Sequence, residues 1–436
     1  MATATLQTKA TRRERWAWYM YDFGNSAYAA VVLLAVYSAY FEGVVAEGRN
    51  GSLLWGISVG IAMLVVAVTS PILGAIADYS GSKKKFLLFY TIMSVLFTAA
   101  LFFATRGQIV IGMVFFILAE IGYRSAQVFY NSLLPEIASD EELGRVSGNG
   151  WAIGTAGGVL CLLLILPLIV IIEGDFIVRL SLVITAVFFA ASAIPIFRWL
   201  PEKAKSKPIP ANENYFTIAI KQLRNTLGTA RNFKEFLKFM AAFLIYNDGI
   251  IMALDFAAII GAVLFGLEQQ GLIIFVIIVQ ISNVFGAYVF GWAVEKYSGK
   301  QALVASLLFM LAAIFWLYFN QTQTGFFMIG ILAGFAIAGT QSVSRTMVGF
   351  FAPPGQSAEF YGFFAVAGRT SSFIGPTIYG VVATVAANWY QNRGETAVLA
   401  EQLGQRTAVL SIAVFIIIGM VLLLTVNEKK AREQSL

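Results

Sequence analysis

The chain has 436 residues, of which 58% are hydrophobic and only 12% are charged, and its mean hydropathy is +0.76. One water-soluble core cannot bury so much apolar surface, so the composition excludes soluble classes and indicates a multi-pass membrane protein. The net charge of +6 does not indicate a nucleic-acid partner, because the placement of the basic residues in loops accounts for it.

Twelve apolar runs are long enough to cross a bilayer as helices, which takes roughly 20 residues each. They lack the alternating polarity of barrel strands. The first run is too long for the core of a signal peptide and lacks a small-residue cleavage site, so we expect it to remain as the first span. The fold class we predict is an all-α integral membrane protein with twelve transmembrane helices, at residues 17–41, 53–77, 86–104, 109–130, 148–172, 176–197, 239–265, 271–294, 302–320, 325–348, 361–387 and 408–426.

The loops between these runs differ in charge. Most of the 30 Lys and Arg residues lie in the two tails, in the 83–85 and 198–238 loops, and in other loops on the same side of the predicted bilayer. Loops on the opposite side hold only Arg49, Arg106, Arg179, Arg393 and Arg406. By the positive-inside rule, both termini are expected in the cytoplasm.

Several kinds of chemistry have no sequence support. The chain contains no His, which removes the commonest metal ligand and the usual proton carrier at neutral pH, so proton transfer would fall to carboxylates. The single Cys161 lies in an apolar run, and we interpret it as a small hydrophobic residue. No phosphate-binding G-x-x-x-x-G-K-[ST] loop occurs. We therefore expect no enzyme, cofactor or metal site, and transport driven by gradients.

The two halves of the chain resemble each other. At a constant offset, Tyr79-Ser80-Gly81 recurs as Tyr297-Ser298-Gly299, and Pro135, Glu141, Gly144, Gly150 and Gly157 recur as Pro353, Glu359, Gly362, Gly368 and Gly375. This ordered set indicates duplication into two six-helix bundles, at 1–197 and 239–436, with a cytoplasmic linker at 198–238. The later part of the linker has helical apolar spacing, and it is either an amphipathic helix on the inner membrane surface or a solvated tether.

A short motif, GAIADYSGSKKK, follows the second run at residues 74–85. Gly74 permits close helix approach, Asp78 can accept hydrogen bonds from a neighbouring helix end, and Gly81 turns the chain. Lys83 and Lys84 would hold the loop in the cytoplasm. We expect a gating motif in which Asp78 contacts the inner end of the eleventh span. Alternatively, it is an ordinary short basic loop.

Polar residues are concentrated in predicted spans 1, 4, 7 and 10. A charged side chain at mid-bilayer costs roughly 3 kcal/mol, so these groups should pair or line water rather than face lipid. The candidates for binding substrate or a coupling ion are Asp22, Asn25, Glu120, Arg124, Gln127, Asn247, Asp248, Asp255, Gln341, Ser344 and Arg345.

Two interpretations of these residues remain open. Glu120 and Arg124 could form an i, i+4 ion pair that only holds helices together, and Asp22 could be an interfacial carboxylate at a helix start. Alternatively, the set forms a mixed-charge, amide-rich pocket for a zwitterion. In that case we expect Asp248 to be the main protonation site, because the missing side chain of Gly249 lets another group or a substrate come close, and Asp22 to be the secondary one.

Within the fifth run, Gly150, Gly154 and Gly158 are spaced four residues apart. This small-xxx-small pattern predicts a flat helix face for close packing.

Four stretches resemble the vacuole-effluxer-like branch of the major facilitator superfamily, which comprises fungal autophagy-related vacuolar amino-acid exporters and their bacterial relatives. They are YDFGNSAY at 21–28, YNDG at 246–249, GTQSVSRT at 339–346 and PPGQSAEFYGFFAVAGRTSSFIGP at 353–376.

The resemblance implies a secondary transporter in which helices 1, 4, 7 and 10 line a central cavity. It implies an amino-acid-like small-molecule substrate. From the intramembrane carboxylates and the absence of His we expect proton coupling, and we expect a monomer in the bilayer of the bacterial inner membrane. An exporter of lipids or hydrophobic drug-like compounds, and a non-transporting membrane sensor, are the alternatives.

Overall fold

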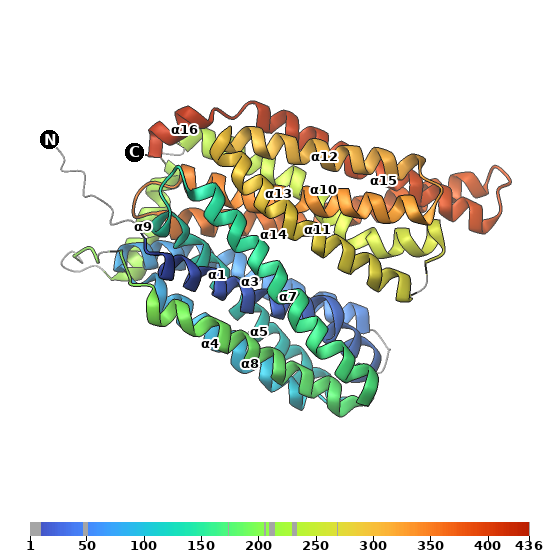
Figure 1. Cartoon of the computed structure of the whole chain (residues 1–436), viewed down its shortest axis with the longest axis horizontal. Coiled ribbons are helices and arrows are strands. Elements are labelled where there is room, and N and C mark those ends of the chain that lie inside the picture. The colour runs from blue at the N-terminus through green and yellow to red at the C-terminus, as the bar shows by residue number, and fades with distance from the viewer. Residues whose placement is uncertain are drawn as a thin grey trace. The chain divides into compact units, whose positions relative to one another are not determined.

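The computed structural model describes residues 10–46, 51–172, 174–204, 206–208, 214–228, 233–267 and 269–435. Within these ranges the chain forms helices and loops, and no strand (Figure 1). The helices are α1 Arg12–Tyr28, η1 Ala29–Ala35, α2 Tyr37–Tyr40, η2 Phe41–Val45, α3 Gly51–Ser80, α4 Lys83–Ala100, η3 Leu101–Phe103, α5 Ile109–Ser132, α6 Leu134–Ile137, α7 Leu143–Ile172, α8 Asp175–Trp199, α9 Tyr215–Gly228, α10 Lys234–Phe265, α11 Gln269–Lys296, α12 Gly299–Phe319, α13 Gln323–Phe351, α14 Ser357–Gln391, α15 Ala397–Leu424 and α16 Glu428–Ser435.

Eleven segments among the described residues are long and apolar enough to cross a membrane. They correspond to the predicted runs other than 361–387. Helix α14 passes through that run, but the side chains of residues 369–373, including Arg369, lie outside the described set. The all-α membrane fold is confirmed, and the twelfth span stays a prediction.

The chain forms two compact units. Unit 1 comprises Met1–Leu223 together with Pro354–Gly362, and unit 2 comprises Arg224–Pro353 together with Phe363–Leu436. In unit 1, α1 packs against α7 and α8, α5 packs against α3 and α4, and α4 packs against α8. In unit 2, α10 packs against α15, α13 packs against α11 and α12, and α12 packs against α15. The same order of packing therefore recurs, as duplication of the sequence predicts.

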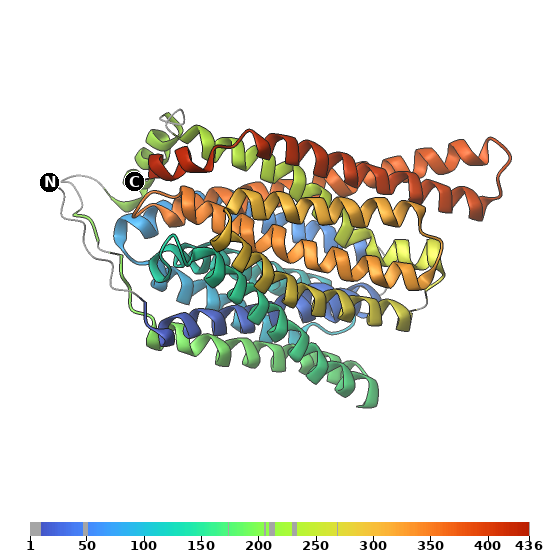
Figure 2. The same ribbon diagram turned by 45° about the horizontal axis from the view of Figure 1, so that its top comes forward.

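In unit 2, α14 and α15 form an antiparallel hairpin. Figures 1 and 2 show that this hairpin extends beyond the neighbouring helices α11, α12 and α13. Its two helices contact closely, because a Cβ atom at Gly404 would lie 2.6 Å from the carbonyl oxygen of Ala383.

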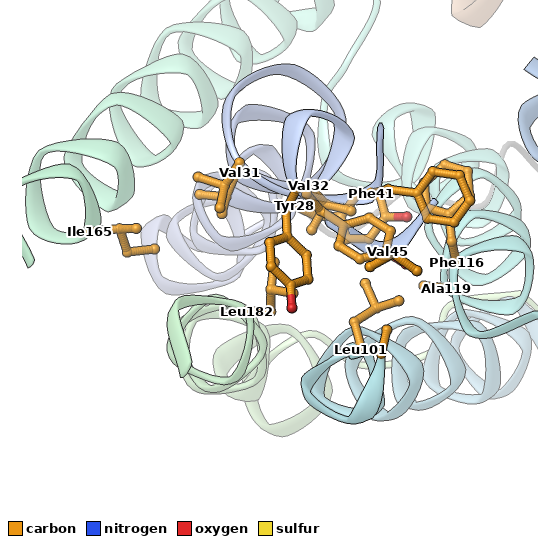
Figure 3. Packing of buried hydrophobic residues seen from close by; sticks show 14 of the residues in the cluster. Tyr28, Val31, Val32, Phe41, Val45, Leu101, Phe116, Ala119, Ile165 and Leu182 are labelled. Carbon is orange, nitrogen blue, oxygen red and sulfur yellow. The ribbon is translucent and has the colours of Figure 1, made fainter. Parts of the chain in front are cut away.

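The C-terminal part of the first span lies in a hydrophobic cluster of unit 1. Beyond α1 the helix widens into π-type turns, in which the amide of Val36 donates to Val31 O and that of Ala46 donates to Phe41 O. These wider turns change the direction in which later side chains point. Figure 3 shows the resulting packing of Tyr28, Val31, Val32, Phe41 and Val45 with Leu101, Phe116, Ala119, Ile165 and Leu182.

Small residues bring α7 against α1. A Cβ atom at Gly150 would lie 2.3 Å from the Trp18 ring, and one at Gly154 would lie 2.9 Å from Cγ of Asp22. A Cβ atom at Gly158 would lie 3.0 Å from a backbone oxygen of α1. The predicted close-packing face is confirmed.

A carboxylate at the end of unit 1's sixth span caps the third span. The backbone amide of Lys84 donates to Glu202 Oε2 at 2.8 Å. The Lys84 ammonium in turn donates to the carbonyl oxygens of Phe197 and Leu200 near the end of α8. Both helix ends thereby gain partners for groups that a helix leaves unsatisfied.

Unit 2 repeats this arrangement. The backbone amide of Lys300 donates to Glu428 Oε2 at 2.8 Å, and its ammonium donates to Leu424 O at 2.6 Å and Val426 O at 2.8 Å. Neither cap was predicted from the sequence. The signal was a Glu-Lys pair shortly after each sixth span, at 202–203 and 428–429.

Candidate functional site

A buried ion pair lies in the middle of unit 1. Nε of Arg124 is 2.7 Å from Oε1 of Glu120, one turn away on α5. The Glu120 side chain is fully buried, whereas 28% of the Arg124 side chain is exposed. The predicted pairing is present, and part of the Arg124 side chain stays exposed.

Aromatic rings and an amide surround this pair. Tyr28 of α1 stacks on Tyr123 at 4.5 Å between ring centroids, and the Arg124 guanidinium lies 5.1 Å from the Tyr123 ring centroid. The Tyr28 hydroxyl lies beside the Glu120 carboxylate. Gln127 donates through Nε2 to the Tyr123 hydroxyl at 3.0 Å. The two tyrosines were not among the predicted site residues.

Asn25 is a buried amide on the same side of α1. Its residue is 1% exposed, and neither Oδ1 nor Nδ2 has a hydrogen-bond partner among the described residues. Tyr21 and Tyr28, one turn to either side, stack on Tyr130 and Tyr123 of α5. Because burying an amide without partners costs roughly 1–3 kcal/mol, this position suits a water molecule or a polar ligand atom.

The corresponding part of unit 2 contains a buried carboxylate. Asp248 of α10 is 1% exposed, and its Oδ1 accepts a hydrogen bond from the Gly375 amide of α14 at 3.2 Å. Within the described part of the chain, no cationic nitrogen lies within 4.0 Å of the Asp248 carboxylate. Asp248 therefore differs from Glu120, whose charge is paired.

Polar contacts also join α10 to α13. Gln341 donates through Nε2 to Asn247 Oδ1 at 3.1 Å. The hydroxyls of Tyr246 and Ser344 are 2.7 Å apart. Arg345, next to Ser344, is 4% exposed. The structure thus brings together predicted site residues from two predicted spans within one unit.

Two further residues of α10 were singled out from the sequence. Asp255 is exposed and lies about two turns from Asp248, outside these polar contacts, and its role stays a prediction. At Gly249 the group that comes close is Ile416 of α15, because a Cβ atom on Gly249 would lie 2.8 Å from Ile416 Cγ1. Gly249 thereby permits helix packing.

Asp22 and Asp248 occupy related positions in their units. Asp22 of α1 is half-buried and lies against Gly154 of α7, while Asp248 of α10 binds the amide of Gly375 in α14. In both cases an aspartate in the first helix of the repeat lies against a glycine in the fifth.

The motif at the end of α3 contacts the start of α14, as predicted. Asp78 accepts hydrogen bonds from the amides of Ala358 at 3.2 Å and Glu359 at 2.8 Å. Gly74 allows this approach, since a Cβ atom there would lie 2.4 Å from Ala358 O. Gly81 has a φ of 59°, which fits the expected turn.

Lys83 differs from the prediction. It is 1% exposed, so it is not a solvated charge that holds a loop in the cytoplasm. Its Nζ is 3.1 Å from Asp78, 2.7 Å from Glu136 and 2.7 Å from the Ser357 hydroxyl. Two carboxylates and a hydroxyl compensate the cost of burying the ammonium.

Sequence comparison identifies relatives across nearly the whole chain. A family model described as "Vacuole effluxer Atg22 like" matches residues 54–436. The chain is 26% identical to the uncharacterized MFS-type transporter YxiO of Bacillus subtilis (strain 168), over 99% of this chain and 98% of that protein. It is 24% identical to autophagy-related protein 22 of Coccidioides immitis (strain RS), over 74% of this chain and 66% of that protein.

Solved structures with a similar fold are transporters. The major facilitator superfamily transporter FucP, in the outward conformation, matches with a TM-score of 0.68 and 12% identity over 94% of this chain and 97% of that chain. A bacterial homologue of the iron transporter ferroportin, in an outward-facing state, matches with a TM-score of 0.69 and 12% identity over 95% and 99%. At this identity the similarity shows the fold alone.

Proposed function

Because the chain belongs to the vacuole effluxer Atg22-like family and has the major facilitator fold, it is a membrane transporter rather than an enzyme, and we propose that it moves a small zwitterionic, amino-acid-like metabolite by proton-coupled alternating access. The observation that carries this proposal is the Glu120–Arg124 pair, surrounded by tyrosines and amides inside a membrane-spanning helix.

These groups suit both ends of a zwitterion. The Arg124 guanidinium can bind the carboxylate of the substrate, and one of the acidic candidate residues can bind its ammonium group. Asn25 contributes an amide whose oxygen and nitrogen both lack partners in the described structure. A lipid or hydrophobic drug would not compensate the cost of desolvating these polar groups.

Asp248 is the carboxylate best placed to carry the coupling proton. It is buried, and the described residues place no cation beside it, so a proton is the simplest way to neutralise its charge when water is absent. Glu120 already has Arg124 as its counter-charge. We assign the primary role to Asp248 and a secondary one to Asp22.

The contacts of Asp78 fit a conformational gate. Residues 354–362 belong to unit 1, but the rest of α14 belongs to unit 2. The bonds from Ala358 and Glu359 to Asp78 therefore link the start of α14 to α3, and we propose that they break during part of the transport cycle. The loop that follows Asp78 belongs to the set of loops that holds most of the basic residues. This supports a cytoplasmic location for the gate, in a bacterial inner membrane.

A flux screen in proteoliposomes tests the proposal. Amino acids, peptides, nucleosides and hydrophobic dyes would be compared with and without an imposed pH gradient. We expect accumulation of an amino-acid-like solute under the gradient, and loss of this accumulation in Arg124→Gln. Arg145→Gln is the matched control, because Arg145 is an exposed arginine. Transport of hydrophobic dyes alone would favour the lipid or drug exporter, and no flux of any solute would favour a sensor.

A further inference from the structure

Helix α9 divides into faces of different chemistry. Asn214 caps its start, since Asn214 Oδ1 accepts the Thr217 amide at 2.8 Å. Residues 214–228 contain no Asp or Glu. At about 100° per residue, residues three or four positions apart lie on the same side of the helix.

One face of α9 is buried. Ile218 and Ala219 are buried, at 6% and 0% exposure. Gln222, one turn after Ile218, donates through Nε2 to Glu359 Oε2 at 2.6 Å. These contacts fix the orientation of the helix about its own axis.

The remaining surface is half apolar and half basic. Phe216 and Ile220, one turn apart, are 59% and 42% exposed. Lys221 and Arg224 are also exposed, farther round the helix. An apolar stripe beside a basic one is the pattern of helices that lie in a membrane interface.

Chain connectivity keeps α9 close to the bilayer. It ends at Gly228, and the predicted seventh span lies in α10, which begins at Lys234. Six residue steps reach at most about 20 Å. A basic helix surface at this distance is complementary to anionic head groups.

We propose that α9 docks on anionic phospholipid of the bilayer in which the chain is embedded, with Phe216 and Ile220 in the interface and Lys221 and Arg224 at the head groups. Through Gln222 and Glu359, the same helix then connects the membrane surface to the turn of α14 that binds Asp78.

Site-specific quenching tests this docking in the full-length protein without any substrate. In a Cys161→Ala background, an environment-sensitive fluorophore is attached to Phe216→Cys, to Ile220→Cys or, as the water-exposed control, to Ser206→Cys in the loop before α9. Each protein is reconstituted in phosphatidylcholine vesicles with increasing phosphatidylglycerol. Spin-labelled acyl chains report insertion, and aqueous iodide reports exposure to water.

We expect lipid quenching at 216 and 220 that rises with phosphatidylglycerol, and iodide quenching at the control position 206. Adding K221Q and R224Q should weaken docking by roughly 30-fold at low ionic strength, because each basic residue near an anionic leaflet contributes about 1 kcal/mol. The matched pair K429Q and K430Q changes the same charge at exposed positions of α16 and should leave quenching unchanged.

Three results would overturn the proposal. Equal iodide quenching at 216 and 206 would make α9 a solvated tether. Exclusion of both quenchers from 216 would show that protein covers this face. Lipid quenching independent of phosphatidylglycerol would remove the role of anionic lipid.

Discussion

Asp248 accepts a hydrogen bond from the backbone amide of Gly375 and thereby joins α10 to α14. Gly375 directly precedes Pro376, which cannot donate in the helix and weakens the local bonding pattern. The Asp248 carboxylate thus combines a structural contact with a buried charge. A variant that keeps an acceptor oxygen at this position but cannot ionise separates the two properties.

The pair of Glu120 and Arg124 can be tested for its role. Arg124→Gln should destabilise the protein by about 3–5 kcal/mol, because it leaves Glu120 buried without a counter-charge. The double variant Glu120→Gln with Arg124→Gln should recover most of this stability, measured by thermal unfolding in detergent. If the pair binds substrate, flux stays lost in the double variant. Recovery of flux together with stability would instead show that the pair only holds the helix in place.

Asp78→Asn should shift the population toward the state that is open to the cytoplasm. The change removes the ion pair with Lys83 and weakens the contact with the start of α14 by about 0.3–2 kcal/mol. Accessibility of single cysteines at the two ends of the transport path measures the shift. Asp140→Asn, at an exposed position, is the control. Unchanged accessibility at both ends would contradict the gating role.

The two helix caps should contribute similarly to stability. Glu202→Ala and Glu428→Ala each remove the acceptor for a helix amide, at a cost of about 1 kcal/mol. Because the caps lie in different units, the losses should add in the double variant. Thermal unfolding, compared with Glu433→Ala at an exposed position, checks this. A loss from only one of the two would disprove the equivalence of the caps.

Glu202 should also make stability depend on pH. Burial raises the pKa of Glu202 in the folded protein, although the Lys84 amide opposes this shift. With the folded pKa above the unfolded one, the contribution is fully present below the unfolded value and declines as pH rises through the folded value. Glu202→Gln keeps an acceptor and should abolish this decline. The difference in unfolding temperature between variant and wild type should therefore grow in favour of the variant above about pH 4.3; a constant difference would refute the assignment.

Local patterns predicted much of the fold and part of the site. Apolar runs indicated the spans, and four-residue spacing indicated the contact between Glu120 and Arg124. The contact of Asp78 with the start of α14 followed from a short motif and its place between spans. These features depend on neighbours within one helix or on a recurring loop.

Features that depend on distant residues were missed. Lys83 looked like a loop charge because its partners Glu136 and Ser357 are far along the chain. At Gly249 the sequence predicted a close approach but not its partner, because the contact with Ile416 depends on how α10 packs against α15. The stacking of Tyr28 on Tyr123 likewise requires α1 and α5 to be placed side by side.

The most direct test of proton-coupled transport is solute accumulation by Asp248→Asn in proteoliposomes with an imposed pH gradient. The asparagine oxygen can still accept the Gly375 amide, so the fold should be retained. We predict that the variant exchanges substrate at equal pH but no longer concentrates it under the gradient, whereas wild type does both. Accumulation at the wild-type rate would contradict the account.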